Sequence, residues 1–246
     1  MAKVQEFILS ILIGGVIHPK EVFTQKERRA YESFMQTLTT TVKRKTNQPI
    51  VIVMIGLVGS GKSFVAQALA PHIGAVVIEG DVIRTQLRKQ QERYEGMRKI
   101  SENAMLTILR KGGNVIIDSD HIDTAKRASV RAKLRGTDAR LLFIRTIADY
   151  DMAAGHALSA HYSNRPDDFF GGAATPWQGN AQTKGAIVKL REMWRRTPHH
   201  YRWQNKGGGK WVLRDLPFKV FSVVDTGKST TKQDIQKIGE RIKTAF

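Results

Sequence analysis

The feature that most constrains the fold of this chain is a glycine-rich octapeptide between two regular stretches. Residues 56–63 read G-L-V-G-S-G-K-S and fit the pattern G-x-x-x-x-G-K-S of a phosphate-binding loop, the P-loop. An apolar run over 50–55 precedes the loop, and a helix-like run over 64–70 follows it. This strand–loop–helix order is the context that the motif requires, which argues against a chance glycine-rich turn.

The residue types of this loop suit a bound nucleoside triphosphate. Glycines let successive backbone N–H groups face phosphate oxygens, and the next helix directs its positive N-terminal end toward the same anion. Lys62 is expected to reach the β- and γ-phosphates, and Ser63 is expected to bind Mg²⁺. The sequence therefore predicts ATP and Mg²⁺ as cofactors, with ATP held by Gly56, Leu57, Val58, Gly59, Ser60, Gly61, Lys62 and Ser63.

Further apolar runs have the continuous character of strands that are buried on both faces. They lie at 75–79, 114–118, 140–145 and 219–224. Helix-like stretches lie at about 64–71, 82–111, 124–136 and 231–244. This alternation predicts an α/β fold, a P-loop NTPase three-layer sandwich whose five-stranded parallel sheet carries helices on both faces.

The chain before the P-loop strand is expected to form a helical N-terminal extension over 1–48, ahead of a P-loop domain over 49–246. Ala30, Phe34, Leu38 and Val42 recur every four residues within 24–45, which indicates one face of an amphipathic helix. Thr24 with Glu27 three residues later forms a capping-box signal at the start of that helix.

A second helix is expected over 2–17, broken near Gly14 and Gly15. Its apolar run, 7–17, is too short to cross a bilayer. Glu6 also stands where a secretory signal would carry positive charge. We therefore expect a buried helix in a cytoplasmic protein without a membrane partner.

The segment 146–218 lies between the fourth and fifth predicted strands and is expected to be a lid or substrate-binding insertion. It contains a loop over 167–176, a basic helix over 183–196, and a hairpin whose flexible tip is Gly207–Gly209.

The composition excludes some chemistry and suggests a partner. The absence of cysteine excludes disulfides, Cys-ligated zinc and thiol catalysis. A net charge of +18, from 40 Lys and Arg against 22 Asp and Glu, suits polyanions such as nucleic acid. Within 184–219, basic residues alternate with Trp194, Tyr201, Trp203 and Trp211, which fits either single-strand binding or the small core of a subdomain.

Two acidic residues end predicted strands and are candidates for chemistry. Asp118 follows the run Val115-Ile116-Ile117, a Walker-B-like pattern, and is expected to help bind Mg²⁺. Asp81 follows the second strand, where it could accept the proton of an acceptor hydroxyl. Arg84 lies one helical turn later and could face the same acceptor. A capping Asp with a surface Arg is the structural alternative for this pair.

These motifs together give the chain a resemblance to known kinases. The series G-L-V-G-S-G-K-S, E-G-D-V-I-R, N-V-I-I-D-S-D and F-S-V-V-D-T resembles that of the P-loop kinases related to polynucleotide kinase, gluconate kinase and zeta toxins, an AAA-type group of predicted kinases. The resemblance covers roughly residues 49–246 and implies ATP·Mg²⁺-dependent phosphoryl transfer to a hydroxyl. It also implies that Asp81 and Arg84, which match D-x-x-R, are the general base and an acceptor-binding arginine.

One segment departs from that resemblance. Such kinases usually carry lid arginines after the fourth strand, which stabilise the transferring phosphoryl group. Here the corresponding stretch, 151–161, contains His156 and His161 instead. Arg165 is the nearest candidate for a lid arginine, with Arg191, Arg195 and Arg196 farther along the chain.

The leading hypothesis from the sequence is therefore a kinase that acts on a polynucleotide 5′-hydroxyl or on a small sugar-like molecule, with Lys62, Asp81, Arg84 and Arg165 as catalytic residues. The alternative is a nucleotide-regulated nucleic-acid-binding P-loop protein with weak or no kinase activity. A P-loop ATPase that couples hydrolysis to motion is a third hypothesis, and the sequence leaves the oligomeric state open.

Overall fold

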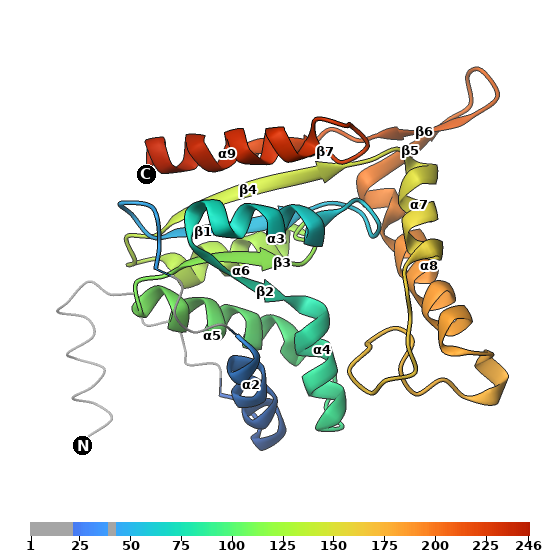
Figure 1. The fold of residues 1–246 in the computed structure, drawn as a ribbon, viewed down its shortest axis with the longest axis horizontal. Helices are drawn as coiled ribbons and strands as arrows, with labels where there is room; N and C mark the ends of the chain where they lie inside the picture. Colours follow the sequence, from blue (N-terminus) through green and yellow to red (C-terminus); the bar gives the residue numbers. More distant parts are fainter. Residues whose placement is uncertain (1–21, 39–42) are drawn as a thin grey trace.

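The computed structural model describes residues 22–38 and 43–246 (Figure 1). Its centre is a five-stranded, entirely parallel sheet with the strand order β2-β3-β1-β4-β7. The strands are β1 (Ile50–Ile55), β2 (Ala75–Glu79), β3 (Asn114–Asp118), β4 (Arg140–Ile147) and β7 (Ser222–Asp225). The predicted α/β fold of a P-loop NTPase, with a five-stranded parallel sheet, is confirmed.

Helices cover both faces of this sheet and give the predicted three layers (Figure 1). One face carries α3 (Lys62–Ile73) and α9 (Thr231–Ala245). The other face carries α2 (Gln25–Thr37), α4 (Gly80–Lys89), α5 (Gly96–Arg110) and α6 (Thr124–Leu134).

The sequence of β1 explains how one strand serves two cores. All six residues are buried apolar residues, and successive side chains of a strand point to opposite faces. Val51, Val53 and Ile55 accordingly pack with α2, α4 and α5, whereas Ile50, Ile52 and Met54 pack with α3 and α9. This burial fixes the P-loop at the carboxyl end of the central strand.

The described part of the predicted N-terminal extension packs on the P-loop domain. The capping box of Thr24 and Glu27 is confirmed, and Ala30 and Phe34 of α2 are buried in the core shared with β1. The helix ends at Thr37 and Leu38 is extended, so the helix expected over 24–45 is shorter where it is described. The helix expected over 2–17 lies outside the described residues.

Two predicted elements have different limits in the structure. The single helix expected over 82–111 is two helices, because Gln91 adopts the left-handed conformation (φ 52°) and the N–H of Glu92 closes a turn on the carbonyl of Leu87. The last strand begins at Ser222 instead of 219. The N–H of Phe221 donates to the carbonyl of Phe143, and ladder pairing with β4 starts one residue later.

The insertion between β4 and β7 lies beyond the carboxyl ends of the strands (Figure 1). It contains α7 (Tyr150–Ser159), the short 3₁₀ helix η1 (Pro176–Gln178), α8 (Ala181–His200) and a hairpin of β5 (Tyr201–Gln204) and β6 (Lys210–Leu213). The expected basic helix and hairpin are thus present, with α8 longer than the predicted 183–196.

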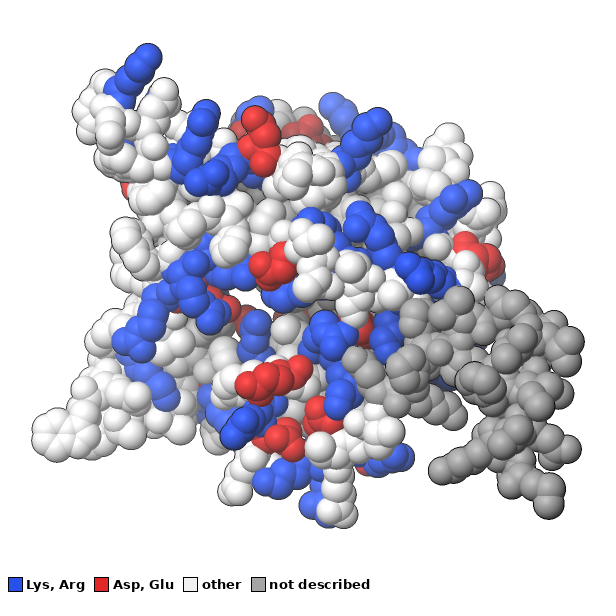
Figure 2. Space-filling view, turned by 180° about the vertical axis from the view of Figure 1, so that it is seen from behind, with Lys and Arg blue, Asp and Glu red and all other residues white. Residues whose placement is uncertain are grey.

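The surface has the character that the composition predicts. Figure 2 shows Lys and Arg side chains spread over the face seen from behind, with Asp and Glu scattered among them. In the described part of the chain, no helix is both long and apolar enough to span a bilayer.

Candidate active site

The P-loop adopts a conformation that its glycines make possible. Gly59 and Gly61 have positive φ values of 82° and 78°. A Cβ on Gly59 would lie 2.1 Å from the carbonyl oxygen of Ala153 in α7, and one on Gly61 would lie 2.8 Å from Cγ2 of Thr226. The loop is therefore enclosed by α7 and by the turn after β7, and larger residues do not fit there.

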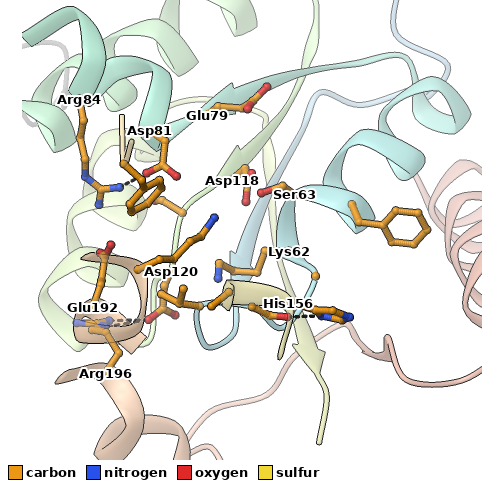
Figure 3. Close-up of a pocket in the computed structure, with 18 of the residues that line it drawn as sticks. Lys62, Ser63, Glu79, Asp81, Arg84, Asp118, Asp120, His156, Glu192 and Arg196 are labelled. Carbon is orange, nitrogen blue, oxygen red and sulfur yellow. Dashed lines mark hydrogen bonds and ion pairs between the residues drawn. The ribbon is translucent and has the colours of Figure 1, made fainter. Parts of the chain in front are cut away.

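Lys62 begins α3 and folds over the loop. Its ammonium donates to the carbonyl oxygens of Gly56 and Leu57, both at 2.9 Å. His156 of α7 hydrogen bonds through Nδ1 to the carbonyl of Gly59 at 2.9 Å (Figure 3). The histidine that replaces an expected lid arginine thus contacts the P-loop and fixes α7 against it.

Carboxylates from neighbouring strands meet beside the loop. Glu79 and Asp118 end β2 and β3 at the same register position. Burial raises the pKa of Asp118, while a hydrogen bond with Ser63 and the charge of Lys62 act in the opposite direction. Burial also raises the pKa of Glu79, and the neighbouring charges of Asp118 and Asp81 add to that effect.

The donor set near Ser63 fits a magnesium ion. Within residues 22–38 and 43–246, no cluster of three or more His, Cys, Asp or Glu side chains could hold a metal alone. Mg²⁺ in nucleotide sites needs fewer protein ligands, because phosphate oxygens and water complete its octahedron. The hydroxyl of Ser63 beside the buried carboxylate of Asp118 offers the hard oxygen donors that this ion prefers.

Asp81 and Arg84 lie across the pocket from Lys62 and Ser63 (Figure 3). Both belong to the first turns of α4, and they form a hydrogen-bonded ion pair. The side chain of Asp81 is 47% exposed, so an acceptor can reach its free oxygen. The structure therefore brings the D-x-x-R pair to the P-loop, as the sequence predicts.

A buried ionic network joins the P-loop strand to the insertion. One oxygen of Asp120 accepts from the N–H groups of Gly56 (3.3 Å) and Ile122 (3.2 Å). The other accepts from Arg196 Nη2 (2.6 Å) and from His200 Nε2 (3.0 Å), both on α8. The hydrogen bond from His200 and the charges of Lys62 and Arg196 outweigh burial and hold the pKa of Asp120 well below its usual range.

Sequence reasoning assigned no role to Asp120, because its partners are 76 and 80 residues away in the chain. The one available signal was its position two residues after Asp118, at the same edge of the sheet. The next residue, His121, is only 6% exposed, and its Nδ1 donates to the carbonyl of Ser119.

These groups line one cavity of about 580 Å³ (Figure 3). Its walls combine P-loop residues with side chains of α4 and α8, among them Lys62, Ser63, Asp81, Asp118, Lys189 and Arg196. A smaller cavity of about 220 Å³ lies between α4 and the 160–170 segment. Asp81, Phe170 and Lys189 line both cavities, so the two spaces adjoin at these residues.

Arg165 is not brought to this site. Its side chain is 75% exposed and forms an ion pair with Asp167, and it lines neither cavity. Arg195 and Arg196, the more remote candidates, do line the larger cavity.

The family comparison matches the part of the chain that carries the motifs. Residues 51–154 match the model described as AAA domain, and this stretch includes the P-loop, Asp81, Arg84 and Asp118. The interpretation of this stretch as an AAA-type P-loop domain is confirmed. No curated protein matches the chain in sequence.

Solved structures are similar to the chain in fold. A structure described as APE1195 matches with a TM-score of 0.50 and 20% identity, over 80% of this chain and 96% of that one. A gluconokinase from Sinorhizobium meliloti 1021 matches at 17% identity over 80% and 95% of the two chains, with a TM-score of 0.45. The APS kinase of Mycobacterium tuberculosis matches at 16% identity over 79% and 95%, with a TM-score of 0.46.

Proposed function

We propose that the protein is an ATP-dependent phosphotransferase that moves the γ-phosphate of ATP to a hydroxyl group. The observation that carries the proposal is the position of Asp81. This carboxylate lines the cavity that contains Lys62 and Ser63, and it also lines the smaller adjoining cavity. A base between a phosphate-binding loop and a second binding space is the arrangement that hydroxyl phosphorylation requires.

The proposed step uses the residues of both walls. Asp81 takes the proton of the acceptor hydroxyl as the oxygen forms a bond to the γ-phosphorus. The bond from that phosphorus to the bridging oxygen breaks, and ADP leaves with the electron pair. Arg84 orients Asp81 through their hydrogen-bonded ion pair.

The donor side is held by the P-loop. Lys62 exchanges its two carbonyl partners for β- and γ-phosphate oxygens, and the backbone N–H groups of the loop face the same anion. Ser63 and Asp118 would hold Mg²⁺, which neutralises phosphate charge when it is bound. Gly59 and Gly61 supply the close backbone approach.

The smaller cavity supports a compact acceptor. At about 220 Å³ it suits one sugar-sized molecule, and Phe169 and Phe170 give it an aromatic wall beside Asp81. A polynucleotide 5′-hydroxyl would have to present a single terminal nucleoside to the same space.

The test is an acceptor screen with γ-labelled ATP and Mg²⁺ that includes sugars, nucleosides, and 5′-hydroxyl RNA and DNA. We expect label on at least one hydroxyl compound, and no label with Lys62→Ala. If no acceptor takes label and the ATP turnover of the wild type equals that of Lys62→Ala, the proposal is wrong.

Nucleic-acid binding is a second candidate function, favoured by exposed aromatic side chains on the insertion. Trp194 is 67% and Trp203 is 52% exposed, and both contact Trp211 edge-to-face beside the exposed Arg202. Such rings with neighbouring cations suit stacked bases. This candidate function predicts oligonucleotide binding that weakens steeply as the salt concentration rises. Binding should be lost in Trp203→Ala and kept in the control Trp177→Ala, whose ring is 97% exposed outside this cluster. No binding at low salt would eliminate this candidate.

A further inference from the structure

The described residues show that most cations at the larger cavity already have partners. Arg84 pairs with Asp81, and Arg196 pairs with Asp120 and Asp123. Lys126 also pairs with Asp123 at 3.2 Å. These charges are neutralised locally, which leaves them little attraction for a phosphate.

Two further cations there are less suited to the transferring group. Lys62 belongs to the P-loop itself. Arg195 is 76% exposed and lies 4.0 Å from the carboxylate of Glu192. Of the described Lys and Arg side chains that line the larger cavity, Lys189 remains.

Lys189 of α8 differs from these side chains in its surroundings. Among the described residues it has no carboxylate partner within ion-pair distance. Its ammonium lies 4.6 Å from the ring centre of Phe170 and 5.8 Å from that of Tyr162. Aromatic faces attract a cation without cancelling its charge, so the rings hold Lys189 while leaving it available to an anion.

The helix is shaped to allow this arrangement. Gly185 lies one turn before Lys189, and a Cβ there would stand 2.2 Å from Cγ of the Tyr162 ring. Only glycine lets the ring lie against α8 at this point. The hydroxyl of Tyr162 donates to the carbonyl of Ala157, which fixes the other end of the ring.

The aromatic wall is in turn attached to the acceptor side. Arg88 of α4 donates to the carbonyls of Pro166 (2.7 Å), Asp168 (3.0 Å) and Phe169 (3.0 Å). The segment that carries Phe170 is therefore tied to the helix that carries Asp81, and Lys189 is held against both.

The position of Lys189 relates it to both halves of the site. It lines the larger and the smaller cavity, as Asp81 does. Its positive charge also acts to lower the pKa of Asp118, the carboxylate beside Ser63. A side chain at this junction faces the space where the γ-phosphate would pass from donor to acceptor.

We propose that Lys189 binds the transferring phosphoryl group and supplies, from α8, the positive charge that lid arginines supply in related enzymes. This rests on the proposed function. The ammonium of Lys189 stabilises the charge on the equatorial phosphoryl oxygens while Asp81 takes the acceptor proton. Its effect is expected to be largest in the transition state of the transfer.

The test uses the full chain and needs no known acceptor. Binding of a fluorescent ADP analogue with Mg²⁺ is measured alone and with fluoroaluminate, which mimics the transferring group. We expect Lys189→Ala to bind ADP as the wild type does and to lose about 10–100-fold of the extra affinity that fluoroaluminate gives. Lys189→Arg should restore part of it. Arg191→Ala, an exposed cation of the same helix outside both cavities, is the matched control.

The outcomes separate this inference from the function on which it rests. If the wild type gains no affinity from fluoroaluminate and turns over no ATP, the proposed function fails, and the role of Lys189 fails with it. If the wild type responds and Lys189→Ala behaves like Arg191→Ala, only the role of Lys189 is wrong. Equal loss of ADP binding with and without fluoroaluminate would also overturn it, because that pattern indicates ground-state binding or folding.

Discussion

Removing the carboxylate of Asp120 should destabilise the protein more than removing any exposed acid of the insertion. The side chain is 15% exposed and accepts from two backbone N–H groups, from Arg196 and from His200. In Asp120→Ala these donors lose their acceptor, and Arg196 keeps only Asp123. Breaking a buried pair by removing one partner costs about 3–5 kcal/mol.

That cost corresponds to a Tm lower by roughly 6–20 °C for a chain of this size. The assay is thermal unfolding followed by circular dichroism. Asp123→Ala is the matched control, because it removes the half-buried partner of the same arginine and leaves Asp120 in place, so we expect at most about 1 kcal/mol. If the two variants have the same Tm, the network does not contribute as we argue.

The pH dependence of the stabilisation by Asp120 follows from the direction of its pKa shift. The pKa of Asp120 is held well below its ordinary value, so the folded state keeps the carboxylate ionised where the unfolded state protonates it. The stabilisation is complete above about pH 4 and is lost progressively as the pH falls below that value.

Three other variants test separate parts of the structure. Burial lowers the pKa of His121 to about 4, so only the unfolded state binds this proton between pH 6.5 and 4, and the free energy of unfolding should fall by about 3 kcal/mol over that range. In His121→Asn, urea denaturation should show a smaller fall of the free energy of unfolding over the same range; the same pH dependence as in the wild type would contradict this. Arg88→Ala frees the segment before Phe170 from α4, and should raise the KM of an identified acceptor about tenfold with the KM for ATP unchanged; an equal change in both constants would argue against it. Gly59→Ala places a Cβ 2.1 Å from the carbonyl of Ala153 at a positive φ, and should weaken ATP binding at least about tenfold by calorimetry; wild-type affinity would show that the loop tolerates the side chain.

The sequence predicts best where one local pattern decides the structure. The run of six apolar residues before the P-loop indicates a strand that is buried on both faces, and β1 is such a strand. Asp118 ends β3, and Asp81 and Arg84 lie in the first turns of the helix that follows β2, so their approach to the P-loop is a consequence of parallel topology. The capping box at Thr24 is equally local.

The sequence predicts the structure less well where a contact with a residue distant in the chain determines it. The break at Gln91 lies in a stretch of good helix formers, and only the packing of two helices on one sheet face requires it. Arg165 was favoured over Arg196 because it is nearer in sequence to the expected lid, yet the contact with Asp120 is made across 76 residues. The cation–aromatic contacts of Lys189 likewise depend on the loop that carries Tyr162 and Phe170, and the sequence has no periodic pattern there that predicts its conformation.

The most direct test of the central claim compares Asp81→Asn with the wild type once an acceptor is identified. The measurement is the single-turnover rate of γ-phosphate transfer at saturating ATP·Mg²⁺, together with the Kd for ATP. We predict an unchanged Kd and a transfer rate lower by about 10²–10⁴-fold, because the amide cannot take the hydroxyl proton. Transfer by Asp81→Asn at the wild-type rate would contradict the account.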